Sequence, residues 1–145
     1  MRRCWKNGRP NGSCHHTMLG SPEIDPTMPS RGFRRLVEEF SRVQTSVLVQ
    51  LRTGHMPLSK HLFWISKASF PVCPSCWQGD ESVHHYLFEC ITWRHERWHM
   101  GKALGTLAKS AKCVLNSKKG IAELLKFVGH TARFRNALGD VPQQI

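Results

Sequence analysis

Acidic residues and long apolar runs are both scarce in this sequence. Only 10 of its 145 residues are Asp or Glu, against 21 Lys or Arg, and no two aspartates are adjacent. Active sites that work through two metal ions hold them with clustered carboxylates, so this composition argues against such chemistry. No apolar run approaches the roughly 20 residues that a membrane-spanning helix needs. The sequence therefore predicts neither a two-metal enzyme nor a membrane partner.

We also expect no secretory signal. The Arg-rich start of the chain is not followed by an apolar segment, and the six cysteines stand at irregular spacing. Disulfide frameworks belong to oxidising compartments, whereas free or metal-bound thiols are typical of reducing ones. We therefore expect the protein in the nucleus or the cytoplasm.

What the chain has in excess is positive charge. The formal net charge is +11, and from Ile91 onward ten Lys or Arg face only three Asp or Glu. A basic surface of this kind favours a polyanionic partner, with nucleic acid ahead of a membrane surface. We expect RNA or DNA, held through its phosphates, and no small-molecule substrate.

The most informative stretch is the segment from Cys73 to Cys90. Cys73-Pro74-Ser75-Cys76 is followed, after eight intervening residues, by His85, the second residue of the pair His84-His85, and four residues separate His85 from Cys90. Three thiolates and one imidazole complete a tetrahedral Zn²⁺ shell with no position left for water or substrate, which is typical of a structural site rather than a catalytic one. The spacing predicts zinc bound by Cys73, Cys76, His85 and Cys90. It also tolerates His84 in place of His85.

Two other interpretations of the cysteines remain open at this stage. A Cys-x-x-Cys pair can be a redox dithiol, although such motifs normally accompany a βαβ pattern that is not visible here. A framework disulfide is the other, and the missing secretory signal argues against it. Metal binding is the interpretation that uses all four residues.

The flanking sequence predicts a mainly α-helical fold built around a CCHC zinc knuckle. Residues 1–29 are rich in Gly, Pro, Asn and Ser and predict a flexible basic arm, residues 30–135 the zinc-knuckle helical domain, and residues 136–145 a fraying tail. The predicted helices begin at Ser30, Ser41, about Leu58, Ser82, Thr92, Leu107 and about Ser117. The β-branched stretch around Val47 and Val49 is also compatible with a strand.

Inward-facing residues follow from helical spacing. Phe33, Leu36, Val37 and Phe40 should line the first helix, and Val43, Val47, Leu48 and Leu51 the second. The buried face of the third helix should carry Leu58, Leu62 and Ile65, and that of the last helix Ile121, Leu124, Leu125 and Val128.

Candidate nucleic-acid contacts come from the basic region after the knuckle. They are Arg94, Arg97, Lys102, Lys109 and Lys112. Trp77 and Tyr86 are candidate stacking platforms for unpaired bases, although core packing is an equally good use for either ring.

Three blocks of the sequence carry a family resemblance. They are Ile24–Ser30, Gln50–Leu62 with Leu51-Arg52-Thr53-Gly54-His55, and Cys73–Arg97 with its Cys/His pattern. Together they resemble the C-terminal zinc-binding region of fungal non-LTR (LINE-like) retrotransposon polyproteins, over about Ile24 to Phe134. In that family the region follows the reverse transcriptase and RNase H domains.

The resemblance carries several expectations. It implies His85 rather than His84 as the ligand, and a role in binding template RNA or target DNA. Ser82 stands where the family commonly has Thr, a change that should not disturb the metal. The paired aspartates of a polymerase and the acidic cluster of an RNase H are absent from the chain, so we do not expect an enzyme.

Two alternatives to nucleic-acid binding follow from the same residues. The zinc could hold helices that dock on another protein, such as reverse transcriptase or RNase H modules supplied in trans. The chain could also be a truncated relic of a retroelement without independent activity.

Overall fold

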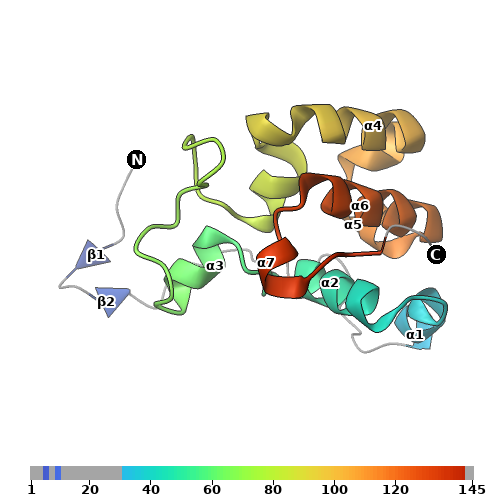
Figure 1. Ribbon diagram of the computed structural model, residues 1–145, viewed down its shortest axis with the longest axis horizontal. Coiled ribbons are helices and arrows are strands. Elements are labelled where there is room, and N and C mark those ends of the chain that lie inside the picture. Colours follow the sequence, from blue (N-terminus) through green and yellow to red (C-terminus); the bar gives the residue numbers. More distant parts are fainter. Residues whose placement is uncertain (1–4, 7–8, 11–30, 143–145) are drawn as a thin grey trace.

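The computed structural model describes residues 5–6, 9–10 and 31–142, and this part of the chain is mainly helical, as predicted (Figure 1). The strands β1 (Trp5–Lys6) and β2 (Arg9–Pro10) pair antiparallel, with Trp5 opposite Pro10. The rest of the predicted arm and residues 143–145 of the predicted tail lie outside the described residues. The helices are α1 (Arg31–Val37), α2 (Arg42–Thr53), α3 (Ser59–Trp64), η1 (His85–Glu89), η2 (Ile91–Trp93), α4 (Arg94–Leu104), η3 (Gly105–Lys109), α5 (Ala111–Asn116), α6 (Lys118–Thr131) and α7 (Arg135–Leu138).

Helix α2 has a well-defined cap at each end. The Ser41 side chain accepts a hydrogen bond from the Gln44 backbone, and the Gln44 side chain accepts one from the Ser41 backbone, which is a capping box. Gly54 ends the helix in the left-handed region, at φ 75°. The two ends fix Val49 within a helix, so the alternative of a strand around Val47 and Val49 is wrong.

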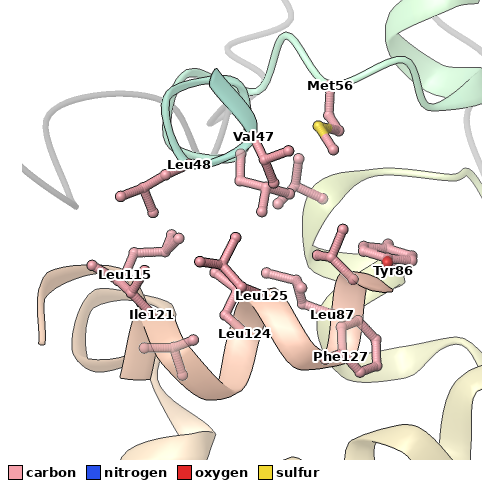
Figure 2. Close-up of a cluster of buried hydrophobic side chains, with 14 of the residues drawn as sticks. Val47, Leu48, Met56, Tyr86, Leu87, Leu115, Ile121, Leu124, Leu125 and Phe127 are labelled. Carbon is pink, nitrogen blue, oxygen red and sulfur yellow. The ribbon is translucent and has the colours of Figure 1, made fainter. Parts of the chain in front are cut away.

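Helix α6 carries the centre of the core. Its residues Ile121, Leu124, Leu125 and Val128 are buried, as their spacing predicted. In Figure 2 the side chains of Leu124 and Leu125 face Val47 and Leu48 of α2. Helices α4 and α5 also contact α6. Each fully buried Leu or Val of this kind contributes about 1.5–3 kcal/mol of transfer free energy.

The third predicted helix is the least buried. Leu58 is buried and Leu62 half-buried, but Ile65, expected inside, has 43% of its surface exposed, and Trp64 has 62%. The helix ends at Trp64, after little more than one turn, so Ile65 leaves the helical register that would have turned it toward the core.

The predicted helix from Leu107 to Leu115 is divided into η3 and α5. Ser110 has an extended backbone, and its side chain accepts a hydrogen bond from the Cys113 amide and so begins α5. Gly105, at φ 59°, ends α4 as predicted.

The packed region continues into the predicted tail. Leu138 and Val141 pack against the core, and the Gln44 side-chain amide donates a hydrogen bond of 2.9 Å to the Pro142 carbonyl. Among the described residues, no helix is both long and apolar enough to cross a membrane.

Gly120 should not tolerate a side chain. A Cβ at this position would lie 2.5 Å from the Val114 carbonyl oxygen and 2.6 Å from Ser117 Oγ. We expect Gly120→Ala to lower the free energy of unfolding by about 1–3 kcal/mol in urea titrations, because the α5–α6 turn must move apart.

Gly101 is the matched control. It lies inside α4, and a Cβ there would meet nothing within 4 Å. Gly101→Ala should therefore raise the free energy of unfolding by about 0.5–1 kcal/mol through helix propensity. Equal effects of the two substitutions would contradict the close approach at Gly120.

Candidate metal centre

The segment from Pro71 to Glu81 is a tight hairpin that brings two cysteines together. The Glu81 amide donates to the Pro71 carbonyl, and the Cys73 amide donates to the Gly79 carbonyl, each at 2.8 Å. At the tip the Trp77 amide donates to the Cys73 carbonyl at 2.9 Å, and Trp77 adopts φ 58°. A left-handed residue that is not glycine is costly, so the surrounding bonds must hold this turn closed.

The second half of the centre is a wide helical turn, η1. The Cys90 amide donates to the His85 carbonyl five residues earlier, at 2.8 Å, which is the bond of a π-helix. Residues five apart in an ordinary α-helix point about 140° apart, at 100° per residue. The wider turn stacks Cys90 over His85 instead, so both side chains can face the hairpin. Such π-turns are frequent at functional sites.

The four predicted ligands converge. The sulfur and nitrogen atoms of Cys73, Cys76, His85 and Cys90 all lie within 4.8 Å of one another and could hold a metal ion. Cys73 Sγ is 3.8 Å from Cys90 Sγ, and Cys76 Sγ is 3.3 Å from His85 Nε2. A tetrahedron with metal–sulfur distances of about 2.3 Å has edges of about 3.8 Å, so the cluster has the dimensions of a coordination shell. No disulfide joins these cysteines, so the disulfide interpretation is wrong for them.

The choice between the two histidines is settled by their positions. His85 is buried and turns Nε2 into the cluster, while its Nδ1 lies 3.5 Å from Glu89 Oε2. His84 is exposed and lies outside the cluster, with Nδ1 3.1 Å from Glu89 Oε1. A carboxylate behind a ligating imidazole fixes its tautomer and orientation, which is the usual arrangement around metal sites.

The environment of the cluster shifts the pKa values of two of its thiols. Burial raises the pKa of Cys73 to about 11, and hydrogen bonds from nearby backbone amides only partly offset this. At Cys76 burial acts in the same direction, but the Gln78 amide and the thiols of Cys73 and Cys90 outweigh it, so its pKa lies below the ordinary value. Binding of a divalent cation supplies the positive charge that a buried thiolate needs.

A buried carboxylate next to the cluster was not predicted from the sequence. Glu81 is completely buried, and Arg133 donates to its two oxygens from Nε at 2.8 Å and from Nη2 at 2.7 Å. Ser59, at the start of α3, donates to Glu81 Oε2 from its amide at 2.7 Å and its hydroxyl at 2.9 Å. The hydrogen bonds to Glu81 raise the pKa of Arg133. We call Glu81, Arg133 and Ser59 the Glu81 network; it joins α3, the hairpin and the turn after α6.

Tyr86 anchors η1 to the core rather than offering a stacking surface. Its ring is fully buried, with centroids 5.2 Å from Phe127 and 5.1 Å from Phe134, and its hydroxyl is 2.7 Å from Thr131 Oγ1. Burial raises its pKa. Of the two uses that the sequence left open for Tyr86, core packing is therefore the one that the structure shows, because a fully buried ring has no free face for a base.

The other candidate contacts differ in exposure. Arg94, Lys102, Lys109 and Lys112 are exposed on α4, η3 and α5, whereas Arg97 is half-buried. Trp77 keeps 75% of its surface exposed at the tip of the hairpin. Lys102 lies over the ring of Trp98, an exposed residue of the same helix, at 5.3 Å.

Comparison of the chain with models of protein families, with curated proteins and with solved structures finds no match.

Proposed function

We propose that this protein is a zinc-stabilised helical module that binds RNA or DNA through its basic surface and has no catalytic activity of its own. The observation that carries the proposal is the convergence of three sulfurs and one imidazole nitrogen within 4.8 Å. Four protein ligands fill a tetrahedral shell, which leaves no exchangeable position for a substrate. Such a centre serves to hold the fold.

Zinc is the metal that this ligand set favours. Thiolates select soft or borderline cations, and a tetrahedral site with three sulfurs and one nitrogen is typical of structural Zn²⁺. The site draws two ligands from the hairpin and two from the helical turn η1. The metal would be the main bond between the two halves of the segment from Cys73 to Cys90.

The nucleic-acid part of the proposal rests on charge and exposure. Arg94, Lys102, Lys109 and Lys112 are exposed and follow the metal centre in the chain, and the chain as a whole carries +11. Lysine and arginine meet phosphates with little dependence on base sequence. The exposed ring of Trp77 adds a surface on which an unpaired base can stack. The resemblance to fungal non-LTR retrotransposon polyproteins points to the same partners, and we propose that origin with it.

The test is the salt dependence of binding. Fluorescence anisotropy with labelled RNA and DNA of equal length should give affinities that fall by about 0.7 to 0.9 log units per log unit of salt for each phosphate contact. Lys102→Gln with Lys112→Gln should lower the slope by about two contacts. The control variant combines Lys67→Gln with Arg42→Gln. Both residues are exposed and precede Cys73 in the sequence, so this variant should leave the salt slope unchanged. Affinity independent of salt would exclude the proposal.

A second function is favoured by one observation. Trp64, the last residue of the short helix α3, and Phe70, six residues later, expose 62% and 72% of their surfaces. Large exposed aromatic side chains are enriched at protein–protein interfaces. A module that docks on another protein through this region would show weak or salt-insensitive binding to nucleic acid in the same experiment.

A further inference from the structure

An open pocket lies beside the metal centre, between η1, α4 and η3. Its volume is about 350 Å³, at the small end of the range of roughly 300–1,000 Å³ for ligand sites. Leu87, Met100 and Ala108 contribute apolar surface. The side chains of His84, Arg97 and Lys109 line the same pocket, so basic groups surround an apolar floor.

Arg97 is the side chain in this pocket that most needs a partner. Its Nη1 is buried and has no hydrogen-bond partner among the described residues. Burial lowers its pKa, although the sulfur of Cys90 and the carboxylate of Glu96 act in the opposite direction. A buried donor without an acceptor is unfavourable, and a guanidinium fork is suited to the oxygens of a phosphate. Lys109, exposed on η3, is the second cation on the pocket wall.

One wall of the pocket is aromatic. His84 directly precedes η1 and Phe88 lies within it, with ring centroids 5.2 Å from each other. Glu89 Oε1 lies 3.1 Å from His84 Nδ1 and holds that ring in place. Adjacent rings of this kind are the surfaces on which unpaired bases stack.

From this arrangement we propose that the pocket receives one nucleotide of a single-stranded nucleic acid, with its phosphate on Arg97 and Lys109 and its base against His84 and Phe88. The proposal deepens the nucleic-acid-binding function and rests on it. In this proposal Arg97 binds a phosphate inside the pocket, whereas the exposed basic residues bind phosphates at the open surface. A base in a duplex is paired and stacked on its neighbours, so the pocket serves single strands only.

The first experiment titrates the labelled full chain with adenosine monophosphate and, separately, with inorganic phosphate. The nucleotide should shift the NMR signals of both the Arg97 Nε–H group and the Met100 methyl group, whereas phosphate should shift only the former. A nucleotide that leaves the Met100 signal unmoved overturns the proposal, because the base then does not enter the pocket. This arm uses the unaltered protein and does not depend on how any variant folds.

The second experiment compares Arg97→Met with Arg94→Met, which removes the same charge one helical turn away on an exposed position. With a single-stranded 12-mer of deoxyadenylate, Arg97→Met should weaken binding about tenfold or more, as expected for a charge-assisted hydrogen bond, and Arg94→Met by less than about threefold. With the corresponding duplex the two variants should behave alike. Equal losses on the single strand would overturn the pocket.

The two proposals fail in different ways. If the chain binds no oligonucleotide at low salt while adenosine monophosphate still shifts both NMR signals, the nucleic-acid-binding function is wrong, and the pocket is a site for free nucleotides rather than for a single strand. If oligonucleotides bind with the expected salt dependence but the mononucleotide shifts neither signal, the basic surface stands and the pocket is overturned.

Discussion

Exchange of Cys90 for serine should remove the metal and unfold the helical domain. Cys90 is fully buried and its sulfur lies 3.8 Å from that of Cys73. Structural zinc contributes apparent binding free energies of about 10–16 kcal/mol in zinc-finger peptides, as much as or more than the 5–15 kcal/mol by which whole domains are stable. We expect elemental analysis to find one zinc per chain in the wild type and none in Cys90→Ser, with a large loss of helical circular dichroism.

Cys113→Ser is the control for this substitution. Cys113 is a half-buried thiol of α5 that lies outside the cluster. Its variant should keep one zinc per chain and the wild-type spectrum. A chelator should reproduce the Cys90→Ser spectrum in the wild type. Unchanged helicity after chelation, or zinc retained by Cys90→Ser, would exclude a structural metal at this site.

Glu81→Gln should produce the second largest effect. The substitution removes the buried charge that the half-buried Arg133 faces at 2.7 Å and 2.8 Å. Removing one partner of a buried ion pair typically costs about 3–5 kcal/mol, and the partial exposure of Arg133 to water places the expected cost at the lower end of that range. We expect a loss of this size in the free energy of unfolding, measured by urea titration of the zinc-loaded protein.

Two further variants separate the ion pair from other effects. Glu39→Gln removes the carboxylate of an exposed pair with Lys118, 3.2 Å apart, and should change stability by less than about 0.5 kcal/mol. Glu81→Gln combined with Arg133→Met should recover part of the loss, because no buried charge is then left alone. Zinc content is measured in each variant, since Cys73 Sγ lies 4.0 Å from Glu81 Oε1. A double variant no more stable than Glu81→Gln would argue against the ion pair as the cause.

The sequence predicted well the features that depend on spacing along the chain. Helix α6 follows from the apolar positions Ile121, Leu124 and Leu125, and the convergence of the four ligands follows from the intervals between them. In both cases every residue needed lies within one helix or one short segment. Local geometry then leaves few arrangements open.

Features that depend on distant residues were missed. Arg133 follows Glu81 by 52 residues, and neither residue stands in a pattern that marks it. The sequence left the burial of Tyr86 open, because it depends on Phe127 and Phe134 from α6 and beyond. The exposure of Ile65 depends on where α3 ends, and the pocket at Arg97 on how α4 and η3 meet η1. Tertiary packing decides all of these.

The separations between partners also bear on the order in which the protein forms during synthesis. Cys73 and Cys90, the first and last residues of the candidate metal centre, are only 17 positions apart in the sequence. Arg52, by contrast, donates to the Leu115 carbonyl 63 residues later, and Glu81 needs Arg133. Short loops close at lower entropic cost, and domains begin to fold as the chain emerges from the ribosome. If the segment from Cys73 to Cys90 binds zinc as it emerges, it would therefore fold before α6 is synthesised, and α6 would then pack against it.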